Sequence, residues 1–343
     1  MCQIIGISNI TGLTRQEINT IALKSKELVR SQKDGFGWCY ATKPRNGTNH
    51  HNYYCEKYVD PINFKGIGSV GFSKRHLRSL TNAINMPMLS SGHPDAPNGG
   101  FLAHGRIATN SKNIVNTHPF RKRNWALVHN GVVDLAWDAD DKEDVATLRD
   151  SGYNLKTLSK RYSTCDSEWL LNTYIHGKGH HDWQNLLEGY AATLSIAPDG
   201  TFIAAKDDSA PLFLSVIPEL NNGAIIFGTA PHFANELAKS IGLSCTPSFA
   251  INKCTAITIS PLGKIKLEQF EPMCVVTNNI GFQKKSEKAF GWNSSKNKTS
   301  DTYARYERSS GGYRPHKADV IPSNPNESYW IKEKENLKQG DLL

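Results

Sequence analysis

Short apolar segments that alternate with polar residues recur along this chain, and this β-type pattern limits the fold more than any other feature. We predict strands over residues 1–9, 101–104, 125–128, 190–197, 201–205, 212–216, 224–228, 255–260 and 262–269. Helical spacing of apolar residues occurs at 14–31, 167–176 and 232–241, with Thr14 placed to cap the first helix. The mixture predicts a strand-rich α+β domain.

The remaining stretches divide into loops and a tail. Residues 43–66 are polar and rich in Asn and His, which favours a loop, and basic residues over 73–85 favour a short helix. After about residue 277, Ser, Asn, Lys and Gly replace the aliphatic residues. We therefore predict a folded domain over residues 2–275 and a flexible, low-complexity tail over residues 276–343.

Composition excludes several classes of protein. Hydrophobic residues make up 38% of the chain, which is enough for a core, and no apolar run approaches the ~18 residues of a membrane span. The formal net charge of +8 is modest, so we expect neither a membrane nor a nucleic acid as partner. Seven cysteines without a Cys-x-x-Cys pair, and an N-terminus unlike a signal peptide, favour a cytoplasmic location.

Cys2 combines two reactive groups if the initiator Met1 is removed, because its thiol and the free α-amine then belong to one residue. An α-amine titrates near ~7.7–8 and can serve as a general base near neutral pH. A neighbouring thiol, with a usual pKa of about 8.5, is readily activated by it. Taken alone, Cys2 is better explained as a buried residue of a first strand, so other motifs have to support a catalytic role.

Four motifs follow one another in a distinctive order. They are Met1-Cys2-Gln3-Ile4-Ile5-Gly6, His104-Gly105-Arg106-Ile107-Ala108-Thr109, His129-Asn130-Gly131 and Asp166-Ser167-Glu168. Together they resemble the class II glutamine amidotransferase domain, an N-terminal-nucleophile (Ntn) hydrolase family with an N-terminal Cys followed by H-x-R-x-A-T, H-N-G and D-[ST]-E. The resemblance implies an α+β fold of four layers, an αββα Ntn-hydrolase sandwich, with the C-terminal tail outside it.

The same resemblance implies roles for the matching residues. Free glutamine carries a carboxylate, an ammonium group and a side-chain amide, so a selective site needs a cation, an anion and an oxyanion hole. Cys2 would be the nucleophile, Asn130 and Gly131 the oxyanion donors, Arg106 the carboxylate ligand and Asp166 the ammonium ligand. The motifs add three substrate-binding residues, of which we expect the histidines to position their neighbours rather than to transfer protons: Thr109, His129 and His104.

Other candidate sites are weaker. The GxGxxG match at residues 66–71 lacks a good preceding strand, so a glycine-rich turn is preferred to a dinucleotide site. His50-His51 with Cys55, and His180-His181 after His176, have metal-ligand side chains but no second cluster with compatible spacing. We favour solvated loop histidines there, and expect neither a metal nor a cofactor.

These observations predict a stand-alone subunit that hydrolyses L-glutamine through a Cys2 thioester and releases glutamate and ammonia. No recognisable synthase segment accompanies the domain, so a separate acceptor protein, a synthase or an amidoligase, is the expected partner. Two alternatives stay open. One is an N-terminal Cys amidase for another amide, such as a γ-glutamyl compound or an acylated amine; the other is a non-catalytic interaction protein that retains the fold.

Overall fold

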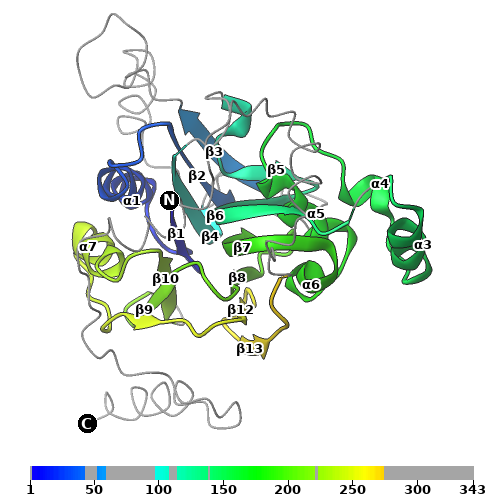
Figure 1. Ribbon diagram of the computed structural model, residues 1–343. Coiled ribbons are helices and arrows are strands. Elements are labelled where there is room, and N and C mark those ends of the chain that lie inside the picture. The colour runs from blue at the N-terminus through cyan, green and yellow to red at the C-terminus, as the bar shows by residue number, and fades with distance from the viewer. Residues whose placement is uncertain are drawn as a thin grey trace, which may run out of the picture.

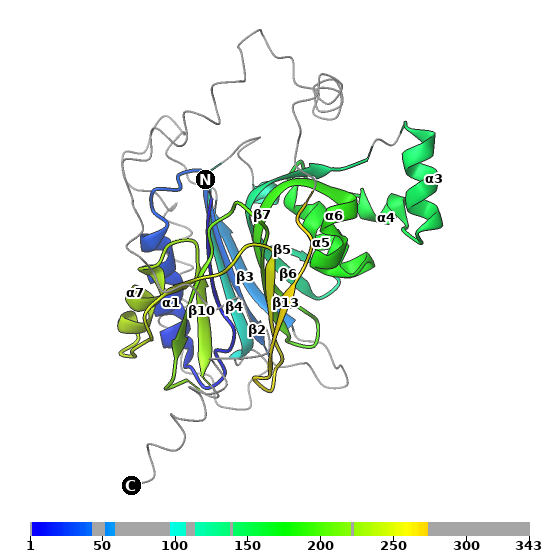
Figure 2. The same ribbon diagram turned by 60° about the horizontal axis from the view of Figure 1, so that its bottom comes forward.

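The computed structural model describes residues 2–42, 52–58, 97–107, 114–137, 140–220 and 223–273. Within these ranges the chain forms two antiparallel β-sheets that face each other, with helices on their outer faces (Figures 1 and 2). This mixed architecture agrees with the predicted α+β class. In the described part of the chain, no helix has both the length and the apolar character needed to cross a membrane.

The first sheet has seven strands in the order β11-β9-β10-β1-β4-β2-β3. Their bounds are β1 Gln3–Ile7, β2 Gly35–Thr42, β3 Asn52–Tyr58, β4 Pro97–Arg106, β9 Phe213–Ile217, β10 Ala224–Gly228 and β11 Phe249–Ala250. The N-terminal strand β1 lies in the middle of this sheet. It pairs with β4 on one side, where Gln3 is opposite Gly105, and with β10 on the other.

The second sheet has six strands in the order β13-β12-β8-β7-β6-β5. Their bounds are β5 Phe120–Lys122, β6 Trp125–Leu135, β7 Leu187–Ile196, β8 Phe202–Lys206, β12 Thr255–Ile259 and β13 Ile265–Gln269. The longest ladder joins β6 to β7 and places Asn130 opposite Ala192. The strand β13 forms one edge of the sheet and β5 the other.

Helices cover the outer face of each sheet (Figure 2). The helices α1 (Arg15–Leu28) and α7 (Phe233–Ser240) pack on the first sheet, and α5 (Ser167–His176) and α6 (Trp183–Leu186) pack on the second. The short helices α3 (Lys142–Asp150) and α4 (Leu155–Leu158) lie beyond α5, and the 3-10 helices are η2 (Ile114–Asn116) and η3 (Gly179–Asp182).

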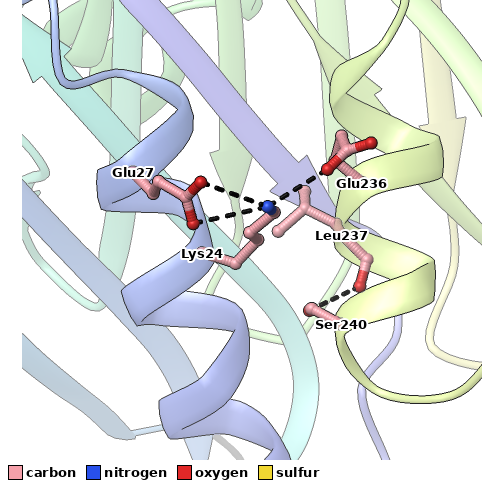
Figure 3. Close-up of polar contacts among 5 residues, drawn as sticks. All are labelled: Lys24, Glu27, Glu236, Leu237 and Ser240. Carbon is pink, nitrogen blue, oxygen red and sulfur yellow. Dashed lines mark hydrogen bonds and ion pairs between the residues drawn. The ribbon is translucent and has the colours of Figure 1, made fainter.

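Local sequence explains the start of α1, and a polar contact joins it to α7. Thr14 accepts a hydrogen bond from the backbone N–H of Glu17, whose side chain reaches back to the Thr14 N–H, as the predicted N-cap requires. In Figure 3 the Lys24 ammonium contacts Glu27 at 3.3 Å and Glu236 of α7 at 3.1 Å. Both carboxylates are exposed and Lys24 is partly exposed, so apolar burial rather than this ion pair holds the two helices together.

Three apolar clusters fill the spaces between the layers. The cluster between the two sheets includes Ile4, Leu102, Val128, Leu194, Phe202 and Phe227, and one further cluster lies under the helices on each outer face. The sheets approach closely at Gly6, where an added Cβ would lie 2.8 Å from side-chain carbons of both Leu194 and Phe202. Apolar packing therefore joins the two sheets to each other and each sheet to its own helices.

Three sequence predictions were wrong. His180, predicted to be a solvated loop histidine, lies on the 3-10 helix η3 and is buried, because Trp183 and Phe270 pack around its ring. The stretch predicted as a loop over residues 43–66 contains strand β3, because pairing to β2 lets Tyr53 and Cys55 cover the sheet interior. The strand predicted to end at residue 128 continues to Leu135, so His129, Asn130 and Gly131 lie inside β6 rather than after it. The predicted 73–85 helix, the 66–71 turn and the 276–343 tail lie outside the described residues.

Candidate active site

Strand alternation gathers polar side chains at one end of the space between the sheets. Residues of β1, β4 and β6 that face the inter-sheet cluster are Ile4, Leu102 and Val128. Because side chains alternate with period two, the residues that share this face nearer the start of β1 are Cys2, His104, Arg106 and Asn130. Three strands distant in sequence thereby bring four of the predicted site residues to one region.

The Cys2 thiol lies directly before β1, beside the end of β4. Its Sγ is 3.4 Å from the backbone nitrogen of Ile107 and 3.5 Å from the Ile107 carbonyl oxygen. Burial raises the pKa of the Cys2 thiol, and the negative charge of Asp166 raises it further, while the Ile107 N–H and the Arg106 guanidinium lower it. Both charged groups are thus close enough to influence the thiol.

Asn130 is fully buried, yet neither its amide nitrogen nor its amide oxygen has a hydrogen-bond partner among the described residues. Leaving a buried polar group unpaired costs on the order of 1–3 kcal/mol. An incoming polar ligand could recover this free energy. Asn130 therefore has the property expected of a preformed donor to a reaction intermediate.

Gly131, the next residue, has a backbone that only glycine fits. Its φ is +150°, and an added Cβ would lie 2.1 Å from the carbonyl oxygen of Tyr190 on β7. The same Cβ would lie 2.7 Å from Nε2 of His129. The pair Asn130-Gly131 is consequently held in one conformation by the β6–β7 ladder.

Arg106 and Asp166 supply opposite charges from different elements. Arg106 ends β4 and is 3% exposed. Asp166 is the N-cap of α5: one carboxylate oxygen accepts from the Ser167 N–H at 3.0 Å, and the other accepts from the Val133 N–H at 2.9 Å. Asp166 thus fixes the start of α5 against β6, two residues beyond Gly131.

Three buried histidines meet around Ser167, the first residue of α5. The Ser167 hydroxyl oxygen lies 2.8 Å from Nε2 of His118 and 2.9 Å from Nδ1 of His129, so the hydroxyl can donate to one ring and accept from the other. The His104 ring stacks on His118 at 3.9 Å between centroids, and its Nε2 is 3.0 Å from the His129 carbonyl oxygen. We call His104, His118, His129 and Ser167 the histidine cluster.

The histidine cluster is neutral near physiological pH. Burial lowers the pKa of His104 to about 3, with a further contribution from the nearby His129 ring. Burial also lowers the pKa of His118 and of His129. Neutral, packed imidazoles hold neighbouring groups in place but do not donate protons readily at pH 7. The positioning role expected for His104 and His129 stays a prediction.

Sequence analysis did not single out two members of this cluster, His118 and Ser167, as site residues. The Asp-Ser-Glu motif contained Ser167, but nothing in a one-dimensional pattern indicates that its hydroxyl meets two rings. The third motif residue, Glu168, accepts hydrogen bonds from the backbone N–H groups of Tyr162 at 2.9 Å and Ser163 at 2.7 Å, so it shapes the approach to α5. Thr109 lies outside the described residues.

Comparisons with known proteins give matches among solved structures but none from the sequence. No protein-family model and no curated protein matches the sequence. Among solved structures, the fold is similar to that of glutamine phosphoribosylpyrophosphate (PRPP) amidotransferase from B. subtilis complexed with ADP and GMP, with a TM-score of 0.46 and 18% sequence identity. The match covers 79% of this chain and 49% of that one, so the chain spans about half the length of that amidotransferase.

Proposed function

We propose that this chain is a glutamine-hydrolysing amidotransferase of the Ntn-hydrolase type, with Cys2 as its nucleophile. The observation that supports the proposal is the position of Cys2, Arg106 and Asn130 on one face of β1, β4 and β6, with Asp166 bonded to β6 at the adjacent start of α5. Arg106 and Asp166 both influence the thiol electrostatically, and Asn130 is a buried amide with no partner among the described residues.

The proposed reaction begins after removal of Met1. The Cys2 Sγ attacks the side-chain carbonyl carbon of glutamine, and the thiol proton passes to the α-amine of the same residue. Transfer of that proton to the leaving nitrogen breaks the C–N bond, which releases ammonia and leaves a γ-glutamyl thioester. Water, deprotonated by the α-amine, then attacks the thioester to give glutamate and restore the thiol.

The surrounding residues supply recognition and transition-state stabilisation. Arg106 binds the substrate α-carboxylate through two parallel N–H donors, and Asp166 binds the α-ammonium group. The Asn130 amide and the Gly131 N–H donate to the oxyanion, and each such donor contributes about 3–4 kcal/mol to the transition state. His104 and His129 hold the Asn130-Gly131 segment, and Thr109 completes the substrate-binding motif.

The wider assignment rests on the motifs. The order of the four motifs supports membership of the class II amidotransferases and an αββα Ntn-hydrolase sandwich over residues 2–275. Delivery of ammonia to a separate synthase or amidoligase, and the role of residues 276–343 as a tail, are parts of the same proposal.

Intact-mass analysis with a glutamine-like diazoketone tests the proposal most directly. We expect the wild-type protein to lack Met1 and to gain one adduct, from which excess glutamine protects it. Cys2→Ser should gain none, while the control Cys245→Ser, which alters a thiol on the loop after α7, should react like wild type.

Each of the other possible outcomes would overturn the mechanism or favour one of the two alternative functions. Full glutaminase activity in protein that keeps Met1 would overturn the mechanism. Turnover of a γ-glutamyl compound or an acylated amine without glutamine hydrolysis would favour the other amidase. Correctly processed protein that neither reacts with the diazoketone nor hydrolyses any of these amides would be a non-catalytic interaction protein.

A further inference from the structure

Three metal-ligating side chains meet on the outer side of the second sheet. His180 and His181 are on the 3-10 helix η3, and Glu268 is on the edge strand β13. The helix η3 follows the C-terminal end of α5, whose opposite end carries Asp166. The ten residues of α5 span roughly 15 Å at 1.5 Å per residue, so this cluster is separate from the candidate active site.

The donor atoms of the three side chains are already close. One ligand atom of each residue lies within 4.8 Å of those of the other two. Nε2 of His181 is 3.5 Å from Oε1 of Glu268, and the two imidazole centroids are 4.3 Å apart. The ligand atoms of a tetrahedral ion, each about 2.0–2.2 Å from the ion, also lie within a few ångströms of one another. Small side-chain rotations would therefore bring the three donor atoms onto one ion.

His180 supplies the second observation. It is 5% exposed, and neither of its ring nitrogens has a hydrogen-bond partner among the described residues. Aromatic rings hold it from two sides, Phe270 at 5.1 Å and Trp183 at 6.3 Å between centroids.

We propose that His180, His181 and Glu268 form a binding site for a divalent first-row transition-metal ion, with Zn²⁺ as the best match. Two imidazoles and one carboxylate are a donor set that suits Zn²⁺, and a water molecule would complete the tetrahedron. An ion bound there joins the edge strand β13 to the helical layer through η3. Its role is therefore to stabilise the fold at this edge.

Lys266 provides a further test of the proposal, because its ammonium group competes with a metal ion for the Glu268 carboxylate. Its ammonium nitrogen is 2.7 Å from the same Oε1 atom of Glu268 that faces His181. The Lys266 side chain is 70% exposed, so it can turn into solvent when a cation arrives. Removal of its positive charge should strengthen metal binding, which is an effect opposite to that of losing a ligand.

The test is a titration of the full-length, chelator-treated protein with Co²⁺ and Zn²⁺, followed by visible absorption and thermal unfolding. We expect one ion per chain and a rise in Tm with Zn²⁺. His181→Ala and Glu268→Gln should each weaken binding by at least about tenfold, and Lys266→Gln should strengthen it. His232→Ala, an exposed histidine at the start of α7, is the matched control and should change nothing.

Cysteine thiolates also bind these ions, and the absorption spectrum of the Co²⁺ complex distinguishes binding at cysteines from binding at the proposed site. The proposed site has no thiolate ligand, so the Co²⁺ complex should lack a sulfur-to-metal charge-transfer band. A strong band of that kind would overturn the proposal, as would equal affinities of wild type and Glu268→Gln. Both ligand variants alter side chains at least 20% exposed, so they should fold, and far-UV circular dichroism checks that they do.

Discussion

Two regions of the space between the sheets, which we call the apolar end and the polar end, are built from the same strands but have opposite chemistry. Toward the middle of the strands, Ile4, Leu102 and Val128 pack against one another and are fully buried. Nearer the start of β1, the same faces carry Cys2, Arg106 and Asn130, and Asn130 is as buried as Leu102. Burial alone therefore does not distinguish the core from the candidate site; the position along the strand does.

The free-energy contributions of the two ends differ in sign. Each buried aliphatic side chain at the apolar end stabilises the fold by about 1.5–3 kcal/mol. An unpartnered buried amide at the polar end destabilises it by about 1–3 kcal/mol. A chain that maintains such groups has a preformed polar site supported by its own apolar core, and substitutions at the two ends should separate activity from stability.

The largest effect is expected for Cys2→Ala. Without the thiol no thioester can form, so glutamine turnover should fall on the order of 10⁴-fold or more. The free energy of unfolding should change little, because Cys2 is only half-buried. Ammonia release and urea unfolding measure the two quantities, and retained turnover would show that the polar end is not a Cys2 site.

A matched pair of substitutions compares the two ends directly. Asn130→Ala should lower kcat by ~10²–10³-fold, since its amide acts on the transition state, while stability stays equal or rises as an unpaired group is removed. Leu102→Ala should lower the free energy of unfolding by about 2–5 kcal/mol and leave the folded enzyme active. The division between core and site fails if Asn130→Ala chiefly destabilises the protein.

Acid should weaken the polar end first. The folded-state pKa of His104, about 3, is below the value of 6.5 for the free side chain, so below pH 6.5 the unfolded chain binds a proton that the folded chain does not. The stability present above pH 6.5 is then lost as the pH falls, by about 1.4 kcal/mol per pH unit for this residue. The lowered pKa values of His118 and His129 act in the same sense.

Buried carboxyls oppose this trend, because burial raises the pKa of Asp134 and of Asp207. Burial raises the pKa of Asp207 to about 6, so acid protonates it in the folded state first and adds stability there. From pH 7 to pH 5 this offsets about 1 kcal/mol, against about 2 kcal/mol lost from His104 alone. Urea unfolding at both pH values should show a net loss, and equal or greater stability at pH 5 would contradict the neutral histidine cluster.

The smallest effect on turnover is expected for Ser167→Ala. Its hydroxyl contacts two buried rings, His118 and His129, so the loss should cost about 1–3 kcal/mol of stability. If the cluster positions Asn130, kcat should also fall by a few fold with KM unchanged. Ser163→Ala, which removes a contact to Glu168 outside the cluster, is the control and should leave kcat as in wild type.

Sequence patterns predicted most elements but not all of their limits. The strand β10 and the helix α5 have the predicted bounds, because β10 is a short continuous apolar run and α5 has apolar residues at helical spacing. The helix α3 was missed because none of its residues is buried and its apolar face, formed by Val145 and Leu148, is narrow. The strand β3 was missed because its polar residues become strand only through pairing with β2.

The sequence by itself determined the features that depend on neighbours along the chain. The capping of α1 by Thr14 and the start of α5 at Asp166 are local, and the motifs named Cys2 and Arg106. Only the tertiary structure decided which of these face one another. His118 meets Ser167 across 49 residues, and Glu268 of β13 meets His181 of η3 on the outer side of the second sheet, because strand pairing and layer packing, not spacing in sequence, set those distances.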